Sequence, residues 1–265
     1  MFNKQIAAFL AALAALLLLC GCTAGEAESL PELIIGCENY EPYSYTDENG
    51  EPAGLDVELA REACRRMGYL PVFRYIDWNE RDTLLESGAV DCLWSCYAMD
   101  EQTDKYAWVG PYMRSRQIVA VPAVSTLWSI EDLAGKRIAV LVGSKAERIF
   151  LQRSDENIPK VRNVYALNKT DELATALRND YVDAIAGDAA TVRRVLQNEE
   201  IEFRFFDEDL RDTACGIAFS KDGDAALREA LAAAMTDMLH DGVAASILER
   251  YGAETDTTSG GLGNE

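Results

Sequence analysis

An α/β fold of two similarly built lobes is what the sequence predicts. Short apolar runs, typical of buried strands, alternate with segments of helical periodicity, which indicates mainly parallel sheets with helices on both faces. Residues 85–94 and 177–186 share one design, in which a helix ends in a tight turn and a Val-Asp pair leads into an apolar strand. This weak internal repeat suggests two lobes built alike.

The first residues have the features of an export signal. Lys4 provides a weakly basic start, and the Ala/Leu run over 6–19 is too short to span a bilayer comfortably. We therefore expect residues 1–21 to be a signal peptide and the protein to act outside the cytoplasm.

The end of this signal resembles the lipobox of bacterial lipoproteins. A small residue precedes Cys22, and Leu19 stands three positions before it, so Cys22 fits the lipid-modified position. Cys20 fits poorly because the bulky Leu19 precedes it directly. An ordinary signal peptide with an incidental cysteine is the alternative. Residues 22–32 are then a polar tether between the lipid and the folded body.

Composition restricts the possible partners. Of 265 residues, about 220 remain for the folded body, enough for one large domain or two small ones. A hydrophobic content of 49% indicates substantial cores. The formal net charge of −20 disfavours nucleic acid or an anionic membrane surface as a partner.

The cysteines are expected to be small buried residues. Cys20 leaves with the signal and Cys22 would be lipid-modified, so five remain, which cannot all pair with one another, and most stand in apolar runs. If any pair forms, we expect Cys37 with Cys92 or with Cys96, because their strands should be neighbours. The chain has one histidine and no close cysteine pairs flanking a turn, so we expect no metal site. The cysteines that remain are Cys37, Cys64, Cys92, Cys96 and Cys215.

The stretch 36–45 is the strongest candidate for a binding loop. It is dense in aromatic and acidic residues, and it follows an apolar run at 33–35 that predicts a buried strand. Asp56 can cap the helix that comes next. A loop between a strand and a helix is where α/β sheets bind ligands. The alternative is that these tyrosines are amphipathic surface residues.

The remaining elements follow from apolar runs, capping residues and glycine stops. Gly88 ends a helix before a strand, and Ser129 with Asp132 three residues on resembles a capping box. Expected strands are 71–76, 117–121, 136–142, 161–167, 201–206 and 214–219, with two more at the ends of the segments 85–95 and 181–188, each after a turn. Expected helices are 81–86, one after Lys145, 171–178, 224–239 and 243–251, and a disordered tail is expected over 254–265.

The order and spacing of several short motifs resemble those of the polar amino-acid-binding, family 3 solute-binding proteins of bacterial ABC importers. The resemblance is collinear over about residues 33–252. The motifs that carry it are 38–45, 49–50, 54–60, 87–91, 110–112, 129–136, 142–144 and 182–184.

This resemblance implies a fold of the periplasmic-binding-protein type II, a two-lobe clamp. Lobe 1 would comprise 33–112 plus 216–253, and lobe 2 would comprise 116–212. Two hinge strands, near 112–116 and 211–215, would join the lobes.

The resemblance also implies a ligand site. Tyr40 and Trp78 take the places of aromatic walls, Asp188 that of the acid which receives the ligand α-ammonium group, and Glu38 can add an acceptor. The helix start at Ser144 favours a carboxylate. The alternatives are core packing for the rings and simple solvation for the acids. The ligand-binding residues implied are Glu38, Tyr40, Trp78, Ser95, Cys96, Ala98, Gly143, Ser144, Lys145 and Asp188.

One departure from the family pattern concerns the ligand carboxylate. Residues 95–98 would line the floor of the site in lobe 1. Family members carry an arginine in the loop after this lobe 1 floor, whereas residues 100–105 here contain none. Ala98 also stands where a hydroxyl is frequent. The site as read favours the amine end of a ligand more than its carboxylate. Candidates to replace the arginine are Lys105, Lys145, Arg114 and Arg116.

The resemblance implies a lipid-anchored, extracytoplasmic receptor that captures an amino acid or related small amine and delivers it to an ABC permease and ATPase. We expect a monomer without cofactor, metal or catalytic residues. A sensory or orphan binding domain that signals to a partner is one alternative. An enzyme of the cyclohexadienyl dehydratase type is another. It is disfavoured because its substrate carboxylates require anion-binding groups, and the arginine that would supply one is missing here.

Overall fold

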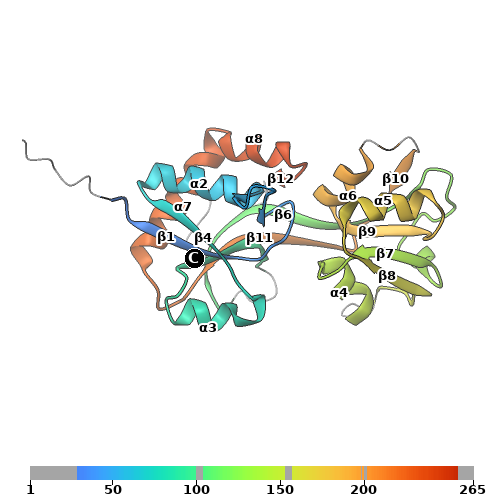
Figure 1. Cartoon of the computed structure of the whole chain (residues 1–265), viewed down its shortest axis with the longest axis horizontal. Coiled ribbons are helices and arrows are strands. Elements are labelled where there is room, and N and C mark those ends of the chain that lie inside the picture. Colours follow the sequence, from blue (N-terminus) through green and yellow to red (C-terminus); the bar gives the residue numbers. More distant parts are fainter. Residues whose placement is uncertain (1–28, 100–103, 153–156, 198, 200–201, 256–265) are drawn as a thin grey trace, which may run out of the picture. The chain divides into compact units, whose positions relative to one another are not determined.

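The computed structural model describes residues 29–99, 104–152, 157–197, 199 and 202–255 (Figure 1). The expected signal peptide, the lipid site at Cys22 and most of the tether lie outside these ranges. Within the ranges described, no helix is both long and apolar enough to cross a membrane.

One ten-stranded sheet holds the described residues together. Eight strands follow in the order β4-β1-β5-β11-β6-β9-β7-β8, and β10 and β12 pair with β6. A separate pair consists of β2 (Tyr45–Thr46) and β3 (Pro52–Ala53). The strands of the large sheet are β1 (Glu32–Cys37), β4 (Leu70–Tyr75), β5 (Cys92–Ala98), β6 (Ala107–Pro122), β7 (Arg137–Leu141), β8 (Asn163–Leu167), β9 (Ala184–Asp188), β10 (Phe203–Phe205), β11 (Arg211–Phe219) and β12 (Glu254–Thr255).

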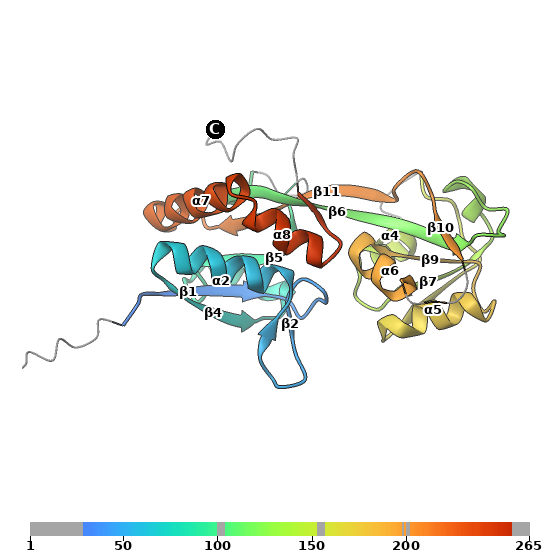
Figure 2. The same cartoon turned by 90° about the horizontal axis from the view of Figure 1, so that it is seen from above.

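Two parallel sets of strands define the lobes. In lobe 1, β1 pairs in parallel with β4 and β5, and in lobe 2, β7 pairs in parallel with β8 and β9. The strands β6 and β11 are antiparallel to each other and to their neighbours β9 and β5, and they continue from one set to the other (Figure 2). This arrangement confirms the predicted fold class.

Helices cover both faces of the parallel strands. The α-helices are α2 (Leu55–Met67), α3 (Arg81–Glu86), α4 (Lys145–Gln152), α5 (Thr170–Arg178), α6 (Ala189–Leu196), α7 (Ala225–His240) and α8 (Val243–Arg250). Short 3₁₀ helices occur at Trp78–Glu80 and Glu131–Leu133. In Figure 1, α2, α7 and α8 lie on one side of the lobe 1 strands and α3 on the other.

Alternating side chains divide lobe 2 into two cores. Ile138 and Val140 on β7 point to one face, where they join a cluster that includes Ile149 of α4. Ala139, between them, belongs to the cluster on the other face with Leu173 of α5. Because strand side chains alternate with period two, a short apolar run buried on both faces fits a central parallel strand.

The lobe 1 core is built on the same principle. Trp94 on β5 is 1% exposed and lies in the cluster that α2 and α7 cover, whereas its neighbour Leu93 joins Leu85 of α3 on the opposite face. Each large apolar side chain buried in this way contributes roughly 1.5–3 kcal/mol to stability.

Several local expectations were wrong. The strand expected at 117–121 begins earlier, at Ala107, because β6 is one continuous strand that pairs with β11 between Ala107 and Gln117. Asp56 does not cap α2, which begins at Leu55. Of the capping box expected at Ser129, one half is present: the Asp132 carboxylate accepts hydrogen bonds from the backbone N–H groups of Trp128 and Ser129.

The ends of the folded body also differ from expectation. The predicted tether ran to residue 32, yet Glu32 already belongs to β1. The predicted tail began at Glu254, which with Thr255 pairs with β6 as β12. The rest of the predicted tail, 256–265, lies outside the described residues.

Gly54 is the glycine whose replacement should disrupt the binding loop most. Its φ of 118° is one that L side chains rarely adopt, and a Cβ there would overlap the carbonyl groups of Tyr43 and Pro42. We expect Gly54→Ala to lower the free energy of unfolding by about 3 kcal/mol or more, measured by urea denaturation.

Gly50→Ala is the matched control, since Gly50 also has a positive φ but its Cβ would meet nothing within 4 Å. Its loss should stay near about 1 kcal/mol. Equal losses in the two variants would show that overlap with the loop carbonyls is not the cause.

Candidate functional site

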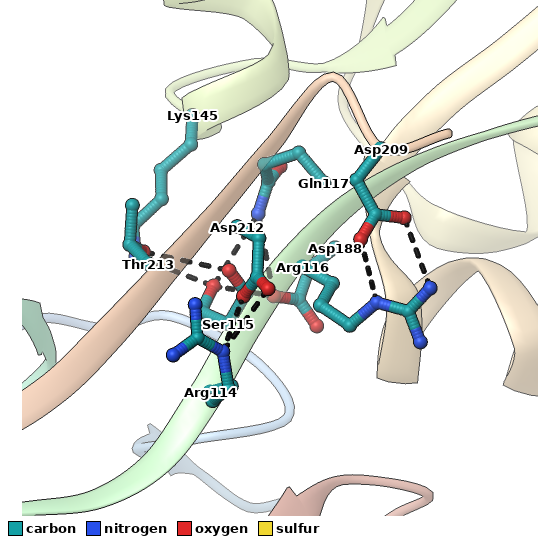
Figure 3. A network of polar contacts seen from close by, with 9 residues as sticks. All are labelled: Arg114, Ser115, Arg116, Gln117, Lys145, Asp188, Asp209, Asp212 and Thr213. Carbon is teal, nitrogen blue, oxygen red and sulfur yellow. Dashed lines mark hydrogen bonds and ion pairs between the residues drawn. The ribbon is translucent and has the colours of Figure 1, made fainter. Parts of the chain in front are cut away.

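Asp188 is the centre of a buried polar network at the carboxyl end of β9. Its Oδ1 accepts from the backbone N–H of Ala190 (3.1 Å), which caps α6, and its Oδ2 accepts from Ser115 (2.9 Å) and Gln117 (3.3 Å) (Figure 3). The Tyr43 side chain also hydrogen-bonds to it. The residue is 3% exposed. Burial raises the pKa of Asp188, and these hydrogen bonds partly offset the effect.

The two arginines of this part of β6 are engaged elsewhere. Arg114 Nε lies 2.9 Å from Asp212, and Arg116 donates two hydrogen bonds to Asp209, of 2.7 and 3.1 Å. Side chains on a strand alternate between faces, so both arginines lie on the face opposite to Ser115. Of the four residues expected to replace the missing arginine, these two therefore already bind protein carboxylates.

Lys145 brings a cation to the network from lobe 2. As the first residue of α4, it extends its Nζ to within 3.2 Å of the Cys96 carbonyl oxygen, 3.4 Å of Ser115 Oγ and 3.7 Å of Cys96 Sγ. Burial alone would lower the pKa of Lys145. Negative charge on the Cys96 and Cys215 sulfur atoms, and then on the Asp188 carboxyl group, more than offsets this, so the pKa lies above its ordinary value. The Asp188 carboxylate is the partner that favours the ammonium form of Lys145.

Lys105, the remaining candidate, is bound to lobe 1. Its Nζ lies 2.5 Å from Asp82 Oδ2. Loop positions 100–103 belong to the segment that lacks the family's arginine, and they lie outside the described residues. Among the four candidates, Lys145 is the one whose cation reaches the Asp188 network.

A second buried carboxyl group supports the floor of lobe 1. Asp56 is 2% exposed and accepts hydrogen bonds from the Cys96 backbone N–H and from the Tyr112 hydroxyl, each of 2.7 Å. Burial raises its pKa to about 7. Beside this contact, Ser95 Oγ accepts from the Glu38 backbone N–H (3.1 Å). The sequence reading missed this role because it placed Asp56 at a helix cap.

Glu38 lies among several cations. It is half-buried, and burial raises its pKa, while the charges of Arg148, Arg81 and Lys145 partly offset this shift.

The two predicted aromatic walls have different neighbours. Tyr40 packs against Tyr43 with ring centroids 5.3 Å apart, so it borders the Asp188 network. Trp78 packs edge-on against Tyr97 (5.0 Å), and the Arg81 guanidinium lies 5.6 Å from the Trp78 ring and donates to the Tyr97 hydroxyl (3.2 Å). Arg81 had been read only as part of a helix.

The start of α4 is already occupied by a carboxylate of the protein. The Gly143 backbone N–H donates to Glu147 Oε2 (2.7 Å), and the Glu147 backbone N–H donates to Ser144 Oγ (3.1 Å). One amide group at this helix start, that of Gly143, thus binds the helix's own glutamate. Ala98, the last predicted floor residue, is half-buried and pairs in register with Cys215.

The spaces beside the site differ greatly in size. Next to Asp188 and Tyr43 there is only about 10 Å³, roughly the least that one water molecule requires. A cavity of about 670 Å³ lies along α6, β10 and α8, and none of the predicted ligand residues lines it. The Asp188 network is the candidate ligand site because two buried charged side chains, Asp188 and Lys145, meet there with Gln117 Oε1, which is unpaired in the part of the chain described.

No metal site is evident in the described ranges, since nowhere do three His, Cys, Asp or Glu side chains gather in a way that could hold an ion.

The chain is similar to known proteins in both sequence and fold. The sequence profile described as bacterial extracellular solute-binding proteins, family 3, matches residues 33–254. The arginine-binding extracellular protein ArtP of Bacillus subtilis (strain 168) is 27% identical over 210 residues, which cover 77% of this chain and 81% of ArtP. The L-cystine-binding protein TcyJ of Escherichia coli (strain K12) is 25% identical, over 83% of this chain and 82% of TcyJ.

Solved structures show the same fold. An ancestral arginine-binding protein bound to arginine is 26% identical with a TM-score of 0.63, over 83% of this chain and 97% of that protein. An ancestral cationic amino acid solute-binding protein has a TM-score of 0.70 at 23% identity, covering 83% of this chain and 95% of its own.

Asp56 should make stability depend on pH. Its folded pKa of about 7 lies above the ordinary value of 3.8, so the folded state holds a proton that the unfolded state releases. The stabilisation is complete below about pH 4 and is lost as pH rises through about 7, at a slope of at most ~1.4 kcal/mol per pH unit. Urea denaturation of the wild type and of Asp56→Asn between these pH values measures it.

The difference between the two profiles carries the result, because other groups titrate in both proteins. We expect the unfolding free energy of Asp56→Asn to fall less steeply over this range. Parallel profiles would show that Asp56 is ionised in the folded protein throughout.

Proposed function

Because the chain belongs to the bacterial extracellular solute-binding proteins, family 3, we propose that it is a lipid-anchored receptor of an ABC importer. It captures an amino acid between lobe 1 (33–112 plus 216–253) and lobe 2 (116–212) and acts without changing it chemically. The named relatives ArtP and TcyJ are binding proteins for arginine and L-cystine, which supports an amino acid as the ligand class.

The observation that supports this most is the pairing of opposite charges in one buried network. The Asp188 carboxyl group and the Lys145 ammonium ion share the Ser115 hydroxyl, which donates to the first (2.9 Å) and lies 3.4 Å from the second. A zwitterionic α-amino acid carries the complementary pair of charges. Lys145 thereby serves the ligand carboxylate in place of the missing arginine, as a point charge rather than a two-pronged donor.

Gln117 adds an acceptor for the ligand amine. The residue is 1% exposed, and its Oε1 has no hydrogen-bond partner among the described residues. A buried, unsatisfied carbonyl oxygen costs free energy that a ligand N–H can recover. With the Cys96 carbonyl oxygen, which Lys145 now contacts, it offers the α-ammonium group acceptors beside Asp188.

Ligand entry requires Lys145 to exchange partners. The ammonium ion now contacts the floor of lobe 1 through Cys96, and little free volume remains beside Asp188. A ligand that takes over the contacts of Lys145 binds both lobes at once, and this differential binding selects the closed clamp. The hinge segments are 112–116 and 211–215, within β6 and β11.

Substitutions of the charge pair test the assignment of the two ends of the ligand. A thermal-shift screen with L-arginine, L-histidine, L-cystine and putrescine identifies a ligand, and calorimetry gives its Kd. We expect Asp188→Asn and Lys145→Met each to raise Kd by about 100-fold, the loss of one charged partner.

The methyl ester of the ligand lacks the carboxylate, so the wild type and Asp188→Asn should bind it more weakly than the ligand. Lys145→Met should bind the ester and the ligand with similar Kd. The controls are Asp237→Asn and Lys221→Met, which alter exposed residues of the same types and should leave Kd unchanged. A folded protein that none of the probes stabilises would contradict the proposed ligand class.

The two neighbouring cysteines near the N-terminus offer a matched test of the lipid anchor. In a bacterial host fed an alkyne fatty acid, we expect the wild type and Cys20→Ser to be labelled and to fractionate with membranes. Cys22→Ser should be unlabelled and released. Labelling of Cys22→Ser, or release of the wild type, would contradict lipid attachment at this cysteine.

A further inference from the structure

Two buried thiols approach each other beneath the ligand site. Cys96 Sγ on β5 lies 3.4 Å from Cys215 Sγ on β11, and the residues are 1% and 0% exposed. Both are free thiols, as are the other cysteines of the described ranges. The sequence reading favoured Cys37 as the partner of Cys92 or Cys96. Instead, Cys37 Sγ lies 3.7 Å from the Arg74 carbonyl oxygen.

The backbone around the pair brings the two sulfur atoms to one face. Cys215 is in register with Ala98, two residues after Cys96, so on regular strands the cysteines would be diagonal neighbours. The register of β11 with β5 shifts between Gly216 and Ala218, and Cys96 has a φ of 48°, a conformation uncommon for residues other than glycine. Such local departures are held in place by the surrounding structure and cluster at functional sites.

Little movement separates this arrangement from a covalent bond. A disulfide has an S–S length of about 2.0 Å, so the sulfur atoms must approach by roughly 1.4 Å. Lys145 Nζ, 3.7 Å from Cys96 Sγ, places a positive charge where a thiolate forms. Burial raises the pKa of Cys215 well above its ordinary value, which disfavours Cys215 as the first nucleophile, and Cys96 is the thiol beside the Lys145 charge.

We propose that Cys96 and Cys215 are a redox-active dithiol that closes to a disulfide by exchange with a small-molecule disulfide such as oxidised glutathione. The Cys96 thiolate attacks one sulfur of that molecule, whose S–S bond breaks and releases one thiol. Cys215 gives up its proton and attacks Cys96 Sγ in the mixed disulfide, which releases the second thiol. The protein loses two electrons and two protons, and the small disulfide gains them.

The bond would close the chain around lobe 2. The cysteines are 119 positions apart, and this interval contains β7, β8, β9 and both connecting segments. It would also hold Cys96, whose backbone carbonyl contacts Lys145 and whose backbone N–H binds Asp56. The redox state of the pair would therefore act on the lobe 1 floor and on the junction with β11. The proposal rests on the thiol geometry and does not require the proposed ligand.

Peptide mapping tests the pair directly. The full chain is incubated with oxidised glutathione under native conditions, alkylated in denaturant, and digested without reduction. We expect a cross-linked peptide pair containing Cys96 and Cys215, its loss on addition of reductant, and an upward shift of the urea unfolding midpoint in the oxidised protein. Because both thiols are buried, we expect the reaction to take minutes to hours.

Three variants separate this pair from other outcomes. Cys215→Ser should abolish the cross-link and leave glutathione attached to Cys96, whereas Cys96→Ser should abolish both. Cys64→Ala removes another buried thiol and should leave the cross-link intact. A native-like circular dichroism spectrum confirms folding in each case. A folded wild type without the cross-link, or one that pairs Cys37 with Cys92, would overturn the proposal.

Discussion

The pairing of β6 with β11 is the interaction on which both lobes depend. Their antiparallel register runs from Arg211 opposite Gln117 to Phe219 opposite Ala107, with one shift near Gly216. The ion pairs of Arg114 and Arg116 with acids before and within β11 lie along the same segment. Because the parallel strands of each lobe join the sheet through these two strands, any rotation of the lobes must be absorbed there.

Several side chains of the candidate site are positively charged, although the molecule as a whole is strongly negative. The chain carries a formal net charge of −20, yet Lys145, Arg81 and Arg148 all lie near Glu38. At short range, a neighbouring charge in a buried site outweighs the diffuse field of exposed, screened charges. Net charge therefore indicates solubility and excluded partners, whereas ligand chemistry is decided by a few buried groups.

The fold was predictable because its determinants are local. Strands such as 138–140 show themselves as short apolar runs between polar turns, and their order specifies an α/β sheet. Asp56 shows why some local details were wrong. Asp56 resembles a helix cap in sequence, but its partner Cys96 lies 40 positions away, and a tertiary hydrogen bond outweighed the local preference.

The site was predictable only where a motif marks it. Asp188 and Lys145 stood at recognisable positions, whereas Ser115 and Gln117 became visible when β6 was seen to pair with β9. Their one local signal was the alternation Arg-Ser-Arg-Gln over 114–117, which the expected hinge obscured. The thiol pair depends on a register shift between β5 and β11, and no spacing in the sequence encodes that shift.

Because of this four-residue alternation, the function of each side chain in 114–117 depends on its exact position along the strand. The even-numbered arginines lie on one face and bind the acids near β11, whereas the odd-numbered Ser115 and Gln117 lie on the other face and bind Asp188. Point substitutions can change one face without the other, and so tune ligand contacts and bracing separately. Insertion or deletion of a single residue exchanges the faces, bringing guanidinium groups to Asp188 and leaving serine and glutamine opposite the bracing acids. Divergence in ligand chemistry along β6 can thus proceed by replacing residues, while the length of the strand is constrained.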